Sequence, residues 1–177
     1  MKNRIIHSFS IMLCLVLANS ALQAQQARTG TNLKSKSMPY TTLHLNEPDE
    51  VSRIRELMVQ GKKGEALSAA ENYIKKVERL LLPGETIQKY YAYNAYCTVL
   101  TSHGRIEEAV NSCSTAMEQE PLKWSAVNNR GTAKLVGGEV EEALSDYRTA
   151  LSLVEDGNAS AQDTILHNIT LAEGRLP

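Results

Sequence analysis

Aromatic residues are scarce in this chain of 177 residues, at 5% of the composition, and its single phenylalanine, Phe9, lies near the N-terminus. Sheet proteins draw heavily on aromatic and β-branched side chains. This chain is instead rich in Ala, Leu, Ser and Glu, so its composition favours close-packed helices. The chain also lacks an excess of either charge, because it contains 19 Lys and Arg residues and 20 Asp and Glu residues. A nucleic-acid partner normally requires a clustered basic face, and we expect no such partner.

Long apolar runs are limited to one, at residues 9–18. Two positive charges precede it within Met1–Arg4, and small or polar residues follow as far as Ala24, an order that is typical of a secretory signal peptide. The run is too short for a membrane span, which needs about 20 residues. We predict a signal peptide over residues 1–24 and a flexible N-terminal segment over residues 25–46. The processed protein should be periplasmic and not inserted in the membrane, with secretion from the cell as the alternative.

Groups with the spacing of a catalytic or metal site are missing from the sequence. His44, His103 and His167 lie far apart, and none is paired with another ligand type at helical spacing. No phosphate-binding loop, nucleophile elbow or dinucleotide fingerprint occurs. The acidic pairs Glu107-Glu108 and Glu141-Glu142 stand where helices are expected to begin, and acids are favourable there. We expect a protein that is not an enzyme and that uses neither a metal nor another cofactor.

An internal repeat is the strongest signal in the sequence. Gly104–Val110 and Gly138–Leu144 share one pattern at an offset of 34 residues, and the same offset relates Ala116 to Ala150. A fixed period of 34 residues in helix-forming sequence is typical of stacked helix–turn–helix units. By these residues and their spacing the chain resembles the tetratricopeptide-repeat (TPR) family, and we expect an exported bacterial protein of that kind.

The resemblance implies an all-α fold, a right-handed superhelical stack of TPR helix–turn–helix units with a C-terminal capping helix. Gly61–Leu67 repeats the turn motif, but Ala66 precedes Ala109 by 43 residues, so the first unit is divergent. We therefore place a TPR domain at residues 47–177. Its predicted parts are a divergent repeat at 47–82, repeats at 90–123 and 124–157, and a capping helix at 160–173.

Within the second repeat, three-and-four spacing assigns Tyr93 and Tyr96 to the core. Tyr90 and Tyr91 are then available to contact a partner or the preceding helix. In the third repeat the pattern departs from the family at Arg130 and Lys134, which stand where large apolar residues are usual. We expect Arg130 to point into the stack.

Cys97 and Cys113 are the only cysteines after the predicted signal peptide. Export would permit a disulfide between them. The expected antiparallel helix pairing places Cys97 opposite Ala109 and Cys113 opposite Tyr93. Their Cα atoms would then lie roughly 10 Å apart, whereas a disulfide needs about 4.4–6.8 Å. We therefore expect two buried thiols, with the disulfide as the alternative.

In TPR proteins the first helices of successive repeats line a concave groove that holds a peptide or a partner helix. The resemblance therefore implies a non-enzymatic adaptor of the cell envelope, with a protein or peptide partner whose identity the sequence does not give. The alternative is a structural subunit, or a self-associating repeat, of a larger envelope complex. Asparagine side chains can both donate to and accept from a peptide backbone, although on an exposed face they can equally be solvated. The candidate partner-binding residues are Tyr91, Asn94, Thr98, Ser102, Asn128, Asn129, Thr132 and Arg55.

Overall fold

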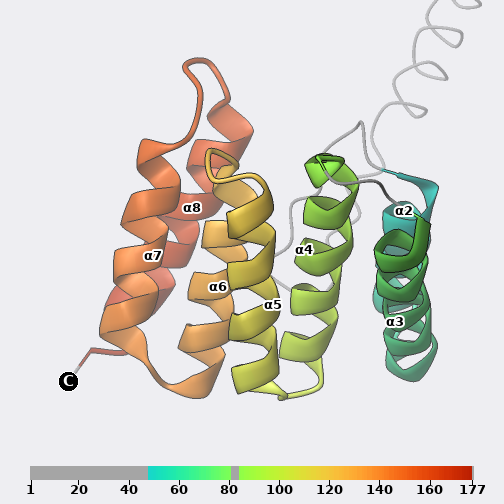
Figure 1. The fold of residues 1–177 in the computed structure, drawn as a ribbon. Helices are drawn as coiled ribbons and strands as arrows, with labels where there is room; N and C mark the ends of the chain where they lie inside the picture. Colours follow the sequence, from blue (N-terminus) through green and yellow to red (C-terminus); the bar gives the residue numbers. More distant parts are fainter. Residues whose placement is uncertain (1–47, 81–83, 177) are drawn as a thin grey trace, which may run out of the picture. The chain divides into compact units, whose positions relative to one another are not determined.

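The computed structural model of the protein describes residues 48–80 and 84–176 (Figure 1). These residues form seven helices and no strand. The predicted signal peptide and N-terminal segment lie outside the described residues. The helices are α2 (Asp49–Val59), α3 (Lys63–Leu80), α4 (Thr86–Ser102), α5 (Ile106–Gln119), α6 (Trp124–Gly137), α7 (Val140–Ser152) and α8 (Ala159–Glu173).

Glycine ends the first helix of each helix pair at the repeated turn motif. Gly61, Gly104 and Gly138 have φ angles of 74°, 72° and 91°, in the left-handed region that side chains with a Cβ rarely adopt. At the start of α2, Pro48 directly precedes the helix and Asp49 lies in its first turn, and both residue types are favourable at a helix N-terminus. The residues that recur in the sequence are thus those that turn the chain from one helix into the next.

The helices are arranged in two layers. Each helix packs on the one before it, and α2, α4, α6 and α8 also contact one another in that order. We call these four helices the inner layer, and α3, α5 and α7 the outer layer. Among the described residues, no two outer helices approach each other as closely as the inner helices do. This arrangement confirms the predicted fold class, an all-α stack of helix–turn–helix units closed by a C-terminal helix.

Small side chains lie where paired helices cross. Ala66, Ala109 and Ala143, which occupy the same place in three turn motifs, are all 0% exposed. Ala116 and Ala150 are also 0% exposed. Because alanine adds only a methyl group, the helices approach closely at these places and larger neighbours fill the space between crossings.

The assignment of the tyrosines in α4 was wrong for Tyr90, which belongs to the core, and right in part for Tyr93 and Tyr96, which pack against the core. Tyr90 is buried at 2% exposure, whereas Tyr93 and Tyr96 are only half-buried. The Tyr93 hydroxyl donates to Oε1 of Glu78 on α3 at 3.0 Å. The physical reason is that α4 packs against α2, α3, α5 and α6, so it has no single buried face to which three-and-four spacing could point.

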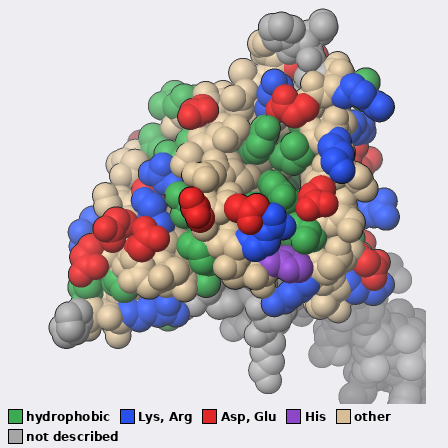
Figure 2. Space-filling model, turned by 60° about the horizontal axis from the view of Figure 1, so that its bottom comes forward, with side chains coloured by type: hydrophobic (Ala, Val, Ile, Leu, Met, Phe, Trp, Pro, Cys, Tyr) green, Lys and Arg blue, Asp and Glu red, His purple; other side chains and the backbone are tan. Residues whose placement is uncertain are grey.

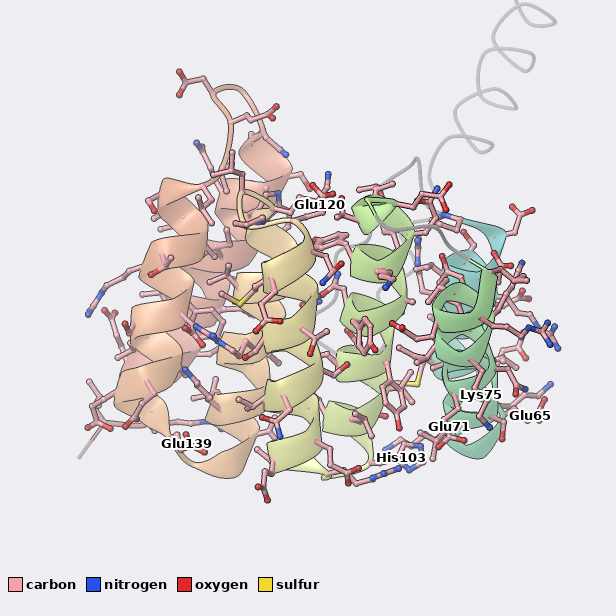
Figure 3. The ribbon with its side chains drawn as sticks, in the orientation of Figure 1. Glu65, Glu71, Lys75, His103, Glu120 and Glu139 are labelled. Carbon is pink, nitrogen blue, oxygen red and sulfur yellow. A yellow bond between two sulfur atoms is a disulfide. The ribbon has the colours of Figure 1, made fainter. Side chains whose placement is uncertain are left out.

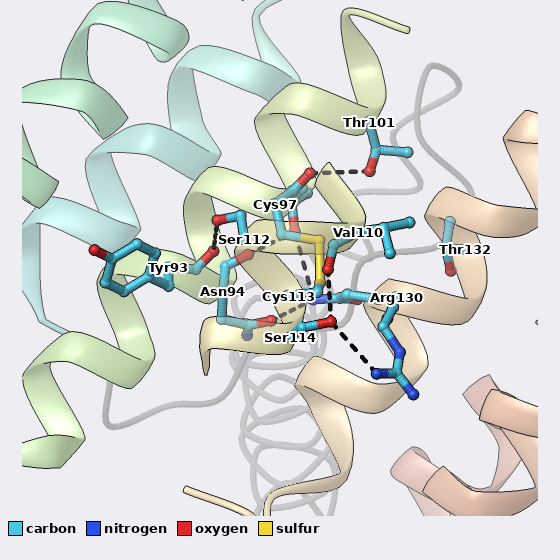
Figure 4. Close-up of a disulfide and its surroundings, with 12 residues drawn as sticks. Tyr93, Asn94, Cys97, Thr101, Val110, Ser112, Cys113, Ser114, Arg130 and Thr132 are labelled. Atoms are coloured by element: carbon cyan, nitrogen blue, oxygen red, sulfur yellow. Dashed lines mark hydrogen bonds between the residues drawn. A yellow bond between two sulfur atoms is a disulfide. The ribbon is translucent and has the colours of Figure 1, made fainter. Parts of the chain in front are cut away.

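The expectation of two free thiols was also wrong, because Cys97 and Cys113 form a disulfide with their Cα atoms 5.3 Å apart (Figure 4). The equivalent residues of the next repeat, 34 positions later, are Gly131 and Tyr147. A Cβ on Gly131 would lie 2.9 Å from Cε1 of Tyr147 and 3.1 Å from the carbonyl oxygen of Ala143. Position 131 of α6 therefore faces two successive turns of α7, at Ala143 and at Tyr147. Strict one-to-one pairing of Cys97 with Ala109 overestimated the distance to the second cysteine.

None of the described helices combines the length and apolar character that a bilayer span requires.

Replacing both cysteines by alanine should lower the free energy of unfolding by about 3 kcal/mol, because the bond closes a loop with a sequence separation of 16 residues. Urea unfolding of the variant and of the unreduced wild type measures the difference. Mass spectrometry of an unreduced digest should find the two cysteine peptides joined. Recovery of both peptides alkylated without prior reduction would contradict the disulfide.

Gly131→Ala should destabilise the stack, because the added Cβ meets the fully buried ring of Tyr147 at 2.9 Å. Overpacking of this kind typically costs ~1–3 kcal/mol, which exceeds the ~1 kcal/mol that alanine gains over glycine in a helix. Gly64→Ala is the matched control, since its added Cβ has nothing within 4 Å. Thermal melting should therefore shift down for the first variant and not for the second. Equal shifts would rule out the close helix crossing at Gly131.

Candidate functional site: the inner helix layer

All eight predicted partner-binding residues lie on helices of the inner layer. Arg55 is on α2, which packs on α4. The other seven are divided between α4 and α6, which pack directly on each other. On α4 they are Tyr91, Asn94, Thr98 and Ser102, and on α6 they are Asn128, Asn129 and Thr132.

A chain of asparagine side chains crosses the inner layer from α8 to α4. Asn168 donates through Nδ2 to Oδ1 of Asn128 at 2.9 Å. Asn128 donates to Oδ1 of Asn129 at 3.5 Å, and Asn129 donates to Oδ1 of Asn94 at 3.0 Å. Asn94 in turn donates to Oγ of Ser125 at 3.5 Å. We call these four asparagines the amide network.

The amide network is buried. Its exposed fractions are 0% for Asn168, 2% for Asn128, 5% for Asn94 and 8% for Asn129. In the structure these amides bind one another, so they tie α4, α6 and α8 together. Burying amides is favourable only when their hydrogen bonds are made. The network makes most of them, three of its four bonds running between helices or to Ser125 on α6, although Oδ1 of Asn168 is buried without a hydrogen-bond partner among the described residues.

Asn94 and Asn128 occupy equivalent places one repeat apart, and each is hydrogen-bonded to an asparagine at a different spacing. Asn94 meets Asn129 across 35 residues, and Asn128 meets Asn168 across 40 residues. The guanidinium of Arg175 also donates to the Leu135 carbonyl across 40 residues, so α8 is shifted along its axis relative to the period. Asn168 was missed because the 34-residue period points to Gln162 instead. A search for a further asparagine on the capping helix would have found it.

The remaining candidates are engaged in packing or local hydrogen bonds. Thr98 donates to the carbonyl of Asn94 at 3.2 Å, and its Oγ1 accepts from Asn129 at 3.4 Å. Thr132 is buried and accepts from the Tyr147 hydroxyl at 3.2 Å. The half-buried Tyr91 ring packs edge-on against Tyr90, with the ring centroids 5.4 Å apart.

Ser102 and Arg55 are both half-buried. Ser102 donates to the Val99 carbonyl at 2.7 Å. The described residues therefore place every candidate on the inner layer, and contact with a partner stays a prediction for each of them.

Basic side chains of α6 are held by one carboxylate. Arg130 donates through Nε and Nη2 to the two oxygens of Asp146 at 2.9 and 2.6 Å, and Nζ of Lys134 lies 2.8 Å from Oδ2. The Asp146 side chain is 6% exposed. Its hydrogen bonds raise the pKa of Arg130 above the ordinary value. The two residues that depart from the family pattern thus form a charged cluster between α6 and α7, and Arg130 also reaches Oγ of Ser114 on α5 at 3.4 Å.

The one lysine of α4, Lys89, lies 3.6 Å from Oε2 of Glu78 on α3. Every lysine and arginine of α4 and α6 is therefore paired with an acid of an outer helix. A ligand along these two inner helices would meet the half-buried hydroxyl groups of Thr98 and Ser102 in place of an unpaired cation.

Two further side chains with a shifted pKa, Glu50 and Tyr73, lie in the α2–α3 pair. Lys76 donates to a carboxylate oxygen of Glu50, and this hydrogen bond lowers the pKa of Glu50. Burial raises the pKa of the Tyr73 hydroxyl to about 12, so Tyr73 is neutral at physiological pH. The Lys76–Glu50 hydrogen bond joins α3 to α2, and neither pKa shift creates a reactive group.

Charges of both signs are interspersed on the face in Figure 2, and a histidine lies among them. Figure 3 shows His103 at the turn after α4. The exposed His103 donates through Nε2 to the carbonyl oxygen of Lys63 at 3.0 Å, which joins this turn to the start of α3. Within residues 48–80 and 84–176, no three His, Cys, Asp or Glu side chains gather as metal ligands would.

No family model matches the chain. Among curated proteins it is similar to the DnaJ protein P58IPK homolog A of Oryza sativa subsp. japonica, with 25% identity over 134 residues. That match covers 76% of this chain and 28% of the relative, so the chain spans less than a third of the relative's length.

Solved structures are similar to the described stack. The TPR2B domain of yeast Sti1 in its pHsp70 complex has a TM-score of 0.57 and 20% identity, covering 73% of this chain and all of that one. The second TPR domain of human RPAP3, in complex with the HSP70 peptide SGPTIEEVD, has a TM-score of 0.52 and 21% identity, covering 70% of this chain and 92% of that one. The described residues therefore have the fold of tetratricopeptide-repeat domains.

Proposed function

We propose that this protein is a non-enzymatic adaptor that binds a peptide or protein segment along its inner layer. The observation that carries the proposal is the fold. Two solved TPR domains with this arrangement of helices are peptide complexes, one with pHsp70 and one with an HSP70 peptide. Both partners are proteins, so a protein partner is the best-supported ligand class for this chain.

The partner that we propose is not an acidic C-terminal peptide. The peptide in the RPAP3 complex, SGPTIEEVD, carries three acidic residues and would favour unpaired cations in its site. In this chain Lys89, Arg130 and Lys134 are paired with acids of the outer layer. The inner helix α4 instead offers the hydroxyl groups of Thr98 and Ser102, which are both half-buried. A neutral peptide that hydrogen-bonds through its backbone suits this surface.

We further propose that the adaptor works outside the cytoplasm, in a bacterial envelope and most directly in the periplasm. The sequence of residues 1–24 supports export. The Cys97–Cys113 disulfide supports an oxidising compartment, because such bonds are rare in proteins of the reducing cytosol. A permanent structural subunit of an envelope complex is the alternative, and it would not need the inner layer as a binding surface.

The binding surface is tested by Thr98→Arg, which adds bulk and charge to a half-buried position of α4. Thr149→Arg is the matched control. Thr149 also donates to the carbonyl four residues earlier, at 2.9 Å, but it is exposed on the outer helix α7. In an affinity pull-down from envelope extract, wild type and Thr149→Arg should retain the partner and Thr98→Arg should lose it. All three proteins should have matching helicity by circular dichroism.

Equal recovery of the partner by all three proteins would contradict binding along the inner layer and would favour the structural alternative. If Thr98→Arg loses helicity, Thr98→Val replaces it, because this change keeps the side-chain volume and removes only the hydroxyl. A partner retained by wild type and weakened by Thr98→Val would support the same surface.

A further inference from the structure

The two ends of the helix stack differ. At the C-terminal end, α8 packs on α6 and α7 and covers their side. At the other end, α4 packs on one side of the α2–α3 pair, and the opposite side carries a groove of about 510 Å³ that no residue of α4 lines. Figure 3 shows Glu65 on the side of α3 that is turned away from α4. We call this surface the end face; its α3 residues are Glu65, Ser68, Ala69, Asn72, Tyr73 and Lys76.

The α3 side of the end face is complementary to itself. A twofold axis between residues 70 and 71 would lay α3 antiparallel on a second copy of α3. Glu65 of each copy then stands opposite Lys76 of the other. At the centre, Ala69 stands opposite Asn72 and Ser68 opposite Tyr73, so a small side chain meets a larger one at each place. Opposite charges at both ends, and small residues facing larger ones in the middle, suit a closely packed antiparallel helix pair.

The charges at the ends of this stripe are available. Glu65 is exposed and makes no ion pair with any described residue. Lys76 is paired with Glu50 of its own chain, but its side chain is 55% exposed and an ammonium has three donors. Lys76 can therefore bind Glu65 of a second copy without releasing Glu50. The two sites lie 11 residues apart on α3, or about 16 Å along the helix.

We propose that the protein forms a twofold dimer through the end face, with α3 antiparallel to α3 of the second copy and a Glu65–Lys76 ion pair at each end. The interface is built on α3, and α4, α6 and α8 of the inner layer are not part of it. The proposal does not depend on the adaptor function and can fail without affecting it.

Two charge reversals and their mixture test the pairing. In Glu65→Lys a dimer would have lysine opposite lysine at both ends, and in Lys76→Glu it would have glutamate opposite glutamate. Each variant alone should weaken dimerisation at least about tenfold relative to wild type in sedimentation equilibrium. An equimolar mixture places opposite charges at both ends again, so native mass spectrometry should find the mixed dimer. Glu142→Lys, at the equivalent exposed place before Ala143 on α7, should dimerise like wild type.

A second pair of variants tests the centre of the interface without touching the Glu50–Lys76 pair. Ser68→Arg adds bulk at the exposed centre of the stripe, and Ser145→Arg adds it at the equivalent exposed place on α7. The first variant should be monomeric and the second should dimerise. A wild-type protein that stays monomeric at all concentrations would overturn the proposal and leave the groove to another occupant. Dimerisation unaffected by either Ser68→Arg or the charge reversals, or a mixture that forms no mixed dimer, would overturn it equally.

Discussion

The close crossing of paired helices at small side chains is the constraint on which the rest of this structure depends. Ala66, Ala109 and Ala143 are fully buried at equivalent turns of the outer helices. In the third repeat Gly131 completes the crossing, because any Cβ there would press on the Tyr147 ring. The second repeat places cysteines at the same two positions and joins them covalently. One geometry is thus satisfied in two chemical ways, by absence of a side chain or by a bond between two side chains.

Close crossing within the helix pairs leaves the inner helices near enough to bond to one another. The amide network spans α4, α6 and α8 through side chains that are at most 8% exposed. Because a buried amide is costly when unpaired, such a network discriminates against other registers of these helices. The charged cluster around Asp146 has the complementary effect on the other side of α6, since it draws Arg130 and Lys134 toward α7. The chemical character of the inner layer, rich in amides and hydroxyls, follows from these two arrangements together.

A repeat stack must also end, and this one ends in two ways. The capping helix α8 buries Ile165, Asn168 and Ala172 and exposes a largely polar face. The α2–α3 pair exposes a groove bordered by both signs of charge. The ends of a solenoid protein must be capped, because each repeat presents a surface on which a further repeat could stack. Here the polar capping helix meets that need at one end, and a self-complementary surface is available to meet it at the other.

The sequence by itself determined the helical class, the turns and the small residues at the crossings. These features are local: a glycine with a positive φ, or an alanine at a fixed offset, is required by the backbone of its own repeat. Only the tertiary structure decided which tyrosine of α4 is buried, that Cys97 reaches Cys113, and that Asn128 meets Asn168. Each of these depends on the angle and axial shift between two helices. A period of 34 residues describes positions along the chain, and neither the crossing angle nor the shift of α8 is contained in it.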